Sequence, residues 1–408
     1  MLSEDGSCRE TVRKFLAWLA VEKGKTASRS TAAYCQARGR LSLREIVRTS
    51  RETALRIEHE AHGQTWSLWC GRRVRVADGS GISMPDTPEN QKKYPQSSRQ
   101  KPGCGFPVMR IVAVFSLATG VMLDLATGSL RTAENKLMRS LWRLLESGDV
   151  FLSDRGFSSY AELYLLGRRG VDCVSRRNQR RNPSTAIKRL GKNDHLVQWL
   201  KMKPCPKGFS KEQWSAIPET MVVREIEVIV DLPGFRAKKI SVVTTLLDPK
   251  VYPAQAIAQL YLWRWRVELF LRDIKITMAM DILRCKTPQM VEKEMWMRVI
   301  AYNLIRALML EAAAMHRVQV DRLSFKGTLT TARHWAPALA NSKMQQPTHS
   351  QLYRIMLAYI ASDPVPLRPN RSEPRARKRR PKGYQLLGKP RNQFKEITHR
   401  NRYRKGLS

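Results

Sequence analysis

Between residues 72 and 177 the hydrophobic pattern switches between two periods, and this switching restricts the fold more than any other feature of the chain. Alternation typical of strands occurs in "RRVRVADGSG", twice in "PVMRIVAVFSLATGVMLDLATG", and in "VDCVSRR", while "DVFLSDRGF" is a short apolar run. Helical spacing occurs in "TAENKLMRSLWRLLE" and "SYAELYLLGRRG". The predicted order is therefore strand, strand, strand, helix, strand, helix, strand.

This order is that of a ribonuclease H-like domain, in which the first three strands are antiparallel and the first and fourth strands are neighbours. The first strand is expected to end at Asp78 and the fourth at Asp154. Prolines and basic clusters interrupt the order after residue 177, and two further strands are predicted at 220–230 and 237–247. Helices are expected to begin after Pro253 and to run from about Pro288 to His316.

The charge of the chain indicates a polyanionic partner. Its 408 residues include 73 Lys and Arg against 35 Asp and Glu, a net charge of +38. Nucleic acid is the simplest partner to offset that charge, and an anionic membrane surface is the alternative. The longest apolar run, around residues 111–119, is too short to cross a bilayer, and no secretory signal is visible. Seven scattered cysteines without a CxxC pair indicate reduced thiols in the cytosol and no disulfides.

A helical wheel of residues 261–281 separates the charged side chains into two groups. At 100° per residue, one face within about 60° holds Tyr261, Arg264, Glu268 and Lys275. Asp273 and Asp281 point the opposite way. Only one acid of this segment therefore belongs to the cationic and aromatic face.

Three carboxylates are candidates for one metal site. Asp78 and Asp154 follow neighbouring strands, and Glu268 lies on the helix that such a domain packs against them. Carboxylate oxygens are the ligands that Mg²⁺ and Mn²⁺ prefer, and two such ions about 4 Å apart can activate an attacking water or hydroxyl while stabilising the leaving oxygen of a phosphodiester. The substrate would then be a nucleic-acid backbone.

The residues at 261–275 follow the spacing Tyr, two residues, Arg, three, Glu, six, Lys without a gap. The sequence here resembles bacterial insertion-sequence transposases of the DDE type, in the branch marked by this Tyr-Arg-Glu-Lys signature. "VADGSG" around Asp78 and "LSDRGF" around Asp154 resemble the first and second Asp blocks of that family. "STAAYCQARGRL" and "NRSEPRARKRRPKGY" resemble its N-terminal and C-terminal segments.

The resemblance implies a role for each matching residue. Asp78, Asp154 and Glu268 are expected to be catalytic and to bind two Mg²⁺ or Mn²⁺ ions. The residues expected to hold DNA near the cut are Tyr261, Arg264 and Lys275, with Trp265, about 40° from the tyrosine on the wheel, as a platform for an unstacked base. Some family members pass through a DNA hairpin and use a Trp of the insertion to stabilise a flipped base, for which Trp199 and Trp214 are the candidates here.

Each site residue has a structural alternative when it is taken alone. Asp78 could be a turn residue of an Asp-Gly pair, and Asp154 could cap the next helix. Glu268 could pair with Arg264 or Arg272 on a solvated helix face, and Trp265 could belong to the core. The joint pattern of three acids and four signature residues favours the functional interpretation. His59 and His62 form an HxxH without further ligands at zinc spacing.

The predicted fold class is α/β, with a ribonuclease H-like catalytic domain interrupted by a β-rich insertion. The expected boundaries are 1–70 for a helical DNA-binding domain, 71–176 and 251–285 for the catalytic domain, 177–250 for the insertion, 286–360 for a C-terminal helical region and 361–408 for a basic Pro/Arg-rich tail. Relatives generally carry a longer helical region before the motif resembling "DGSCRETV", which starts here at Asp5, so a truncated or misassigned start is an expectation for the first domain.

The family resemblance predicts a transposase that cuts the ends of an insertion sequence and joins the 3′ hydroxyl to target DNA. The expected partners are double-stranded DNA, as terminal inverted repeats and target, and a second copy of the chain in a homodimer that holds two ends, with no membrane. The expected location is the bacterial cytoplasm at the nucleoid. Two alternatives stay open: a nuclease of this fold that cuts without joining, and a noncatalytic DNA-binding inhibitor of transposition.

Overall fold

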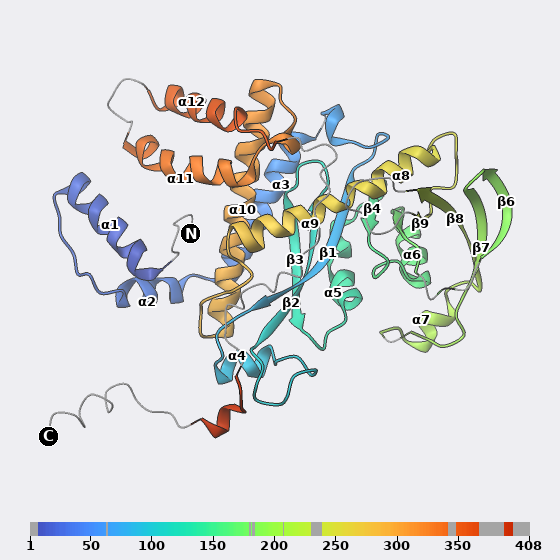
Figure 1. The fold of residues 1–408 in the computed structure, drawn as a ribbon, viewed down its shortest axis with the longest axis horizontal. Helices are drawn as coiled ribbons and strands as arrows, with labels where there is room; N and C mark the ends of the chain where they lie inside the picture. Colours follow the sequence, from blue (N-terminus) through green and yellow to red (C-terminus); the bar gives the residue numbers. More distant parts are fainter. Residues whose placement is uncertain are drawn as a thin grey trace.

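One mixed sheet runs through the protein, a computed structural model, and helices cover both of its faces (Figure 1). The structure describes residues 7–62, 64–178, 181, 184–206, 208–229, 239–341, 348–366 and 387–394. The C-terminal motif at 370–384 and most of the predicted basic tail lie outside these residues. The strands are β1 Val74–Ser83, β2 Val108–Ser116, β3 Met122–Ser129, β4 Val150–Ser153, β5 Asp172–Arg176, β6 Thr185–Gly191, β7 Asp194–Leu200, β8 Thr220–Ile229 and β9 Lys239–Thr244.

The strand order is β3-β2-β1-β4-β5-β9-β8-β7-β6. The pairs β1–β2 and β2–β3 are antiparallel, β1–β4 and β4–β5 are parallel, and the remaining pairs are antiparallel. The predicted antiparallel trio and the predicted contact between the first and fourth strands are both confirmed. The protein is accordingly of the α/β class, with a large mixed sheet.

Strand β1 differs from the prediction at its end. It does not stop at the Asp-Gly pair but continues to Ser83, because the residues from Asp78 onward keep pairing with β2, from Ala113 to Val108. Asp-Gly is a turn signal only when the chain has no partner strand to follow, and here β2 supplies one. The expectation of Asp78 as a strand-end or turn residue is therefore wrong.

The region between β5 and α8 extends the same sheet. The two predicted strands are confirmed as β8 and β9, and β9 pairs with β5 so that the sheet is continuous. Two strands that the sequence did not indicate, β6 and β7, form an antiparallel hairpin at the sheet edge. All seven residues of β6 are exposed or half-buried, so β6 lacks the apolar alternation by which strands are recognised.

The helices divide between the two faces of the sheet. Their bounds are α1 Cys8–Lys23, α2 Ala32–Arg40, α3 Leu43–Ala61, α4 Pro88–Lys93, α5 Glu134–Leu141, α6 Tyr160–Gly167, α7 Lys211–Ser215, α8 Ala254–Trp263, α9 Trp265–Arg272, α10 Pro288–His316, α11 Phe325–Asn341 and α12 His349–Ala361. Buried side chains of α5 and α6 pack on one face, and those of α8 to α12 pack on the other. The predicted long helix is confirmed as α10, with Pro288 in its first turn. No helix among the described residues has the length and apolarity to cross a membrane.

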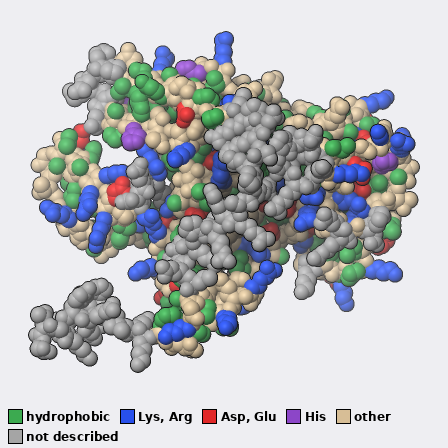
Figure 2. Space-filling view, in the orientation of Figure 1, with side chains coloured by type: hydrophobic (Ala, Val, Ile, Leu, Met, Phe, Trp, Pro, Cys, Tyr) green, Lys and Arg blue, Asp and Glu red, His purple; other side chains and the backbone are tan. Residues whose placement is uncertain are grey.

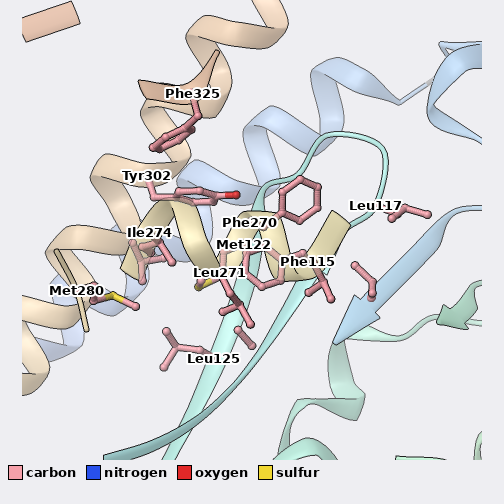
Figure 3. Packing of buried hydrophobic residues seen from close by; sticks show 14 of the residues in the cluster. Phe115, Leu117, Met122, Leu125, Phe270, Leu271, Ile274, Met280, Tyr302 and Phe325 are labelled. Carbon is pink, nitrogen blue, oxygen red and sulfur yellow. The ribbon is translucent and has the colours of Figure 1, made fainter. Parts of the chain in front are cut away.

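Aromatic packing fixes α9 and α10 over strand β2 of the sheet. Phe115 of β2 contacts Phe270 of α9 at 5.6 Å and Tyr302 of α10 at 6.2 Å between ring centroids, and Tyr302 in turn contacts Phe325 at 5.4 Å (Figure 3). Buried aromatic rings each remove a large apolar area from water. This cluster therefore sets the position of α9, which carries Glu268.

The helix predicted after Pro253 does begin there, as α8, but it is not regular. Around Arg264 the backbone hydrogen bonds join residues three apart instead of four apart. This tighter turn separates α8 from α9. Residues Asp273–Thr277 then form a turn of π-helix, in which Met278 N donates to Asp273 O at 3.0 Å. A wheel at a constant 100° per residue consequently does not describe the backbone that carries Lys275.

Candidate active site

Asp78 and Asp154 lie at equivalent positions of two neighbouring parallel strands. The β1–β4 pairing ends with Val76 opposite Leu152, so each aspartate stands two residues beyond that last pair. Val76 and Leu152 both belong to the core cluster under α8, α9 and α10. Because side chains alternate along a strand, both aspartates are directed to the same face as these two residues.

Backbone amides hold the two aspartates. Asp78 Oδ1 accepts from Gly79 N at 2.8 Å, and Asp154 Oδ1 accepts from Gly156 N at 2.7 Å. Asp154 is not a helix cap, because α6 begins at Tyr160 and Ser159 caps it. The capping alternative for Asp154 is therefore wrong.

Gly79 lies close to α5 on the other face of β1. A Cβ at this position would lie 2.8 Å from the carboxyl carbon of Glu134, the first residue of α5. The end of the Glu134 side chain would have to move to admit a side chain at Gly79. Sequence reasoning did not identify Glu134, whose position depends on how α5 packs on the sheet.

Glu268 of α9 pairs with Arg264, the first of its two alternative partners. Arg264 Nη2 donates to Glu268 Oε1 at 2.9 Å, whereas Arg272 pairs with Asp273 at 3.3 Å. The Arg264 side chain is 18% exposed and that of Glu268 is 37% exposed, so the pair is not on a fully solvated face. The Arg264 pairing is thus part of a half-buried site.

The three carboxylates act on one another electrostatically. The pKa of Asp78 is raised to about 6, mainly by burial, with smaller contributions from the negative charges of Asp154 and Glu268; the Gly79 amide and the Arg264 charge oppose this shift. Burial alone would lower the pKa of Arg264, but Tyr261, Glu268 and Asp78 raise it on balance. The arginine therefore stays charged among the acids.

The remaining signature residues surround this group of acids. Tyr261 is only 8% exposed, and its hydroxyl hydrogen-bonds Arg264. Lys275 Nζ donates to Ser80 Oγ at 2.6 Å, and Ser80 shares the face of Asp78. Trp265 is 46% exposed and so is not a core residue. Ser80 was missed by sequence reasoning, although its position two residues after Asp78 is a signal for a shared face.

Neither tryptophan of the insertion is available to a base. Trp199 is 2% exposed, its indole donates to Glu225 at 2.7 Å, and the guanidinium of Arg181 covers its ring at 3.7 Å. Trp214 is 8% exposed and packs against Phe209. The expectation that one of these tryptophans stabilises a flipped base is not supported, because both rings are already covered by protein.

The three acids carry the type of side chain that binds Mg²⁺ or Mn²⁺ in proteins. Asp78, Asp154 and Glu268 offer hard carboxylate oxygens, and a divalent cation bound beside Asp78 would favour its ionised form against the effect of burial. Within the residues described by the structure, no three His, Cys, Asp or Glu side chains converge closely enough to hold a metal ion.

Asp78→Asn is expected to stabilise the metal-free protein. Because the folded-state pKa of Asp78 is about 6, above the ordinary 3.8, ionisation of this group costs stability as the pH rises from about 4 through about 6. Asparagine keeps the acceptor for Gly79 but carries no charge. Thermal unfolding in a chelator should show the variant about 1 to 3 kcal/mol more stable than wild type at pH 7.5, with no difference near pH 4.

The matched control for this measurement is Asp281→Asn, which removes a carboxylate outside the group of acids and should not change stability with this pH dependence. Equal stability of the Asp78 variant and wild type at pH 7.5 would contradict the raised pKa of the buried Asp78 carboxyl.

Comparison with known proteins places this site in a family. The family model for the transposase DDE domain matches residues 69–304. The transposase InsG for insertion sequence element IS4 of Escherichia coli (strain K12) is 29% identical over 287 residues, which cover 69% of this chain and 62% of that protein. The chain thus matches less than two thirds of the length of this relative.

Two solved structures are also similar. The piggyBac transposase synaptic complex with hairpin DNA gives a TM-score of 0.39 at 11% identity, covering 73% of this chain and 59% of that one. The Mos1 transposase paired-end complex with left transposon end gives 0.18 at 13% identity, covering 42% and 54%. The DDE-domain match, in contrast, takes in more than half of the 408 residues and encloses Asp78, Asp154 and Glu268. The chain therefore belongs to the family of transposases with a DDE domain.

Proposed function

We propose that this protein is the DNA transposase of a bacterial insertion sequence, which cuts the element ends and joins the freed 3′ hydroxyl to target DNA by two-metal phosphoryl transfer. One observation carries the proposal. Asp78 and Asp154 each stand two residues beyond the last β1–β4 pair, and Glu268, held by Arg264, comes from a third segment of the DDE domain and contributes with Asp154 to the raised pKa of Asp78. Paired divalent ions need such a group of hard oxygen ligands.

Asp78, Asp154 and Glu268 would hold two Mg²⁺ or Mn²⁺ ions. When bound, these ions activate the attacking water or hydroxyl and stabilise the leaving oxygen of the phosphodiester. The amides of Gly79 and Gly156 orient the two aspartates by their hydrogen bonds. Arg264 holds the Glu268 carboxylate in place by donating to its Oε1.

The cationic residues beside the acids are suited to the DNA backbone. Arg264 and Lys275 would contact phosphates on either side of the scissile bond, and Ser80 positions the lysine. Tyr261 is buried, so it would orient Arg264 through their hydrogen bond. Trp265, which is 46% exposed, could stack on an unpaired base.

The strands β3-β2-β1-β4-β5 with α5, α6, α8 and α9 are proposed to be the ribonuclease H-like catalytic domain, residues 71–176 and 251–285. The proposed accessory regions are 1–70 for DNA binding, 177–250 as the insertion, 286–360 as the C-terminal helical region and 361–408 as the basic tail. Two copies of the chain would hold the two terminal inverted repeats, and target DNA would bind to the same complex. A DNA substrate locates this activity at the nucleoid in the bacterial cytoplasm.

The charge distribution supports a DNA partner. Lys and Arg side chains lie over the N-terminal helices and around the strands of the insertion on the face seen in Figure 2. With a net charge of +38, the chain should bind DNA with a steep salt dependence, since each neutralised phosphate releases a counterion. This long-range attraction would bring DNA to the half-buried acids.

The proposal is tested with a labelled duplex that carries the inverted repeat flanking the gene. Nicking at the repeat boundary is expected with Mg²⁺ or Mn²⁺ and not with a chelator, followed by joining of the cut end to a supercoiled plasmid. A duplex with a scrambled repeat is the control for site-specific cutting.

The other outcomes separate the alternatives. Cutting without joining, with any duplex, would favour a nuclease of this fold. Tight, repeat-specific binding with no metal-dependent cutting would favour a noncatalytic inhibitor. Either result would overturn the transposase assignment.

A further inference from the structure

Three of the seven cysteines meet at one arginine, away from the acids. Arg38 of α2 donates from Nη1 to the Sγ of Cys8 at 3.2 Å and from Nη2 to the Sγ of Cys285 at 3.6 Å. Cys35 lies one turn before Arg38 on α2, and its interaction with Cys8 contributes to the raised pKa of its thiol. The three thiols come from α1, from α2 and from the segment before α10, and all seven cysteines are free. Such a convergence of distant thiols is a candidate redox site.

The surroundings of the three sulfurs differ. Cys35 is exposed and Cys8 is half-buried, so both can be reached by a small oxidant. The pKa of Cys285 is raised to about 12, mainly by burial and also by the neighbouring Glu294, so this thiol keeps its proton. The pKa of Cys35 is also raised, by loss of solvation and then by its interaction with Cys8. Cys285 is therefore a poor nucleophile, and Cys35 is not the thiol that reacts first.

Cys8 has the setting of the attacking thiol. It is the first residue of α1, where the amides of the first turn give the helix its positive end, and Ser7 caps that turn. The guanidinium of Arg38 adds a fixed positive charge within hydrogen-bonding distance of the sulfur. The sulfur of Cys8 thus lies closer to this guanidinium than that of Cys285 does, and it is the one at the start of a helix.

We propose that Cys8 and Cys35 form a peroxide-responsive thiol pair that closes to a disulfide between α1 and α2. The Cys8 thiolate attacks one oxygen of the peroxide, the O–O bond breaks, and a sulfenic acid and water are formed once the leaving oxygen takes a proton. The Cys35 sulfur then attacks the sulfenic sulfur, the S–O bond breaks, and a second water leaves. Two sulfurs are oxidised and two peroxide oxygens are reduced, so the electrons balance.

The disulfide would fix a helix that is otherwise weakly held. No residue of α1 is buried, and Phe15 and Trp18 on it are 53% and 46% exposed. In contrast, α2 is anchored to α10, because the buried Lys293 donates to Gly39 O at 2.8 Å. Oxidation would therefore attach α1 to the body of the protein through α2, and cellular reductants would release it.

Peptide mapping of the full-length protein tests the pair. After treatment with hydrogen peroxide, alkylation of free thiols and trypsin digestion without reductant, mass spectrometry should find the peptide of Cys8 linked to that of Cys35. The link should survive in Cys104→Ser, the matched control, and fall at least about tenfold in Cys8→Ser and in Cys35→Ser. Reductant should remove it completely.

Limited trypsin digestion gives a second readout on the wild-type chain. The segment between α1 and α2 is exposed and contains Lys25 and Arg29. A cut there should release the α1 fragment from the reduced protein but leave it attached in the oxidised protein. A link from Cys8 to Cys285, or oxidation of Cys8 to a sulfinic acid with no link, would overturn the assignment.

Discussion

Glu268→Gln is expected to reduce metal-dependent cleavage at the repeat boundary by about 10³-fold or more, which corresponds to roughly 4 kcal/mol of lost transition-state stabilisation. Glutamine keeps the size of the side chain and can still accept the hydrogen bond that Arg264 now donates to Oε1. It loses the negative charge, however, and a neutral amide oxygen is a much weaker ligand for a divalent ion. Single-turnover rates with saturating protein measure the effect on the chemical step.

Two comparisons make this result specific. Asp281→Asn, a charge removal on the segment that follows the signature, should leave the rate within about twofold of wild type. Binding of Glu268→Gln to the uncut duplex in chelator should also be close to wild type, since the phosphates are held by the basic residues. Cleavage by Glu268→Gln at the wild-type rate would remove Glu268 from the site and with it the three-acid mechanism.

The sequence predicted those parts of the site that depend on local pattern. The order of strands and helices along the chain from residue 72 to 177 followed from the spacing of the hydrophobic residues, because that spacing differs between a strand and a helix that bury one face. The bounds of α10 followed from Pro288 at its start and the length of its apolar pattern. The adjacency of Asp78 and Asp154 then followed from the parallel pairing of β1 with β4.

What the sequence did not predict depends on contacts between distant segments. The Asp-Gly pair at Asp78 stays in a strand because β2 pairs with it, and the end of the Glu134 side chain of α5 lies behind Gly79. The π-helical turn that contains Lys275 could not be read from a regular wheel. For the Asp-Gly pair, a tertiary partner overrides the local preference for a turn.

The insertion is the clearest example of such a nonlocal contact. Its strands join the main sheet through β5 and β9, and a buried ion pair holds β7 against β8. Arg224 is fully buried, donates to both oxygens of Asp194 at 2.7 and 2.5 Å, and donates to Tyr252 O, near the start of α8, at 2.7 Å. Arg224 therefore connects the insertion to the segment that leads into the signature helices.

Arg224→Met is expected to lower the free energy of unfolding by about 3 to 5 kcal/mol, because it leaves the buried Asp194 ionised and without its partner. The double change Arg224→Met/Asp194→Leu should recover most of that loss, since no unpaired charge then remains in the core. Arg189→Met, on the exposed strand β6, is the matched control and should change stability by less than about 0.5 kcal/mol. Chemical denaturation followed by circular dichroism measures all three, and a loss in the single variant no larger than in the control would show that the ion pair does not hold the insertion to the sheet.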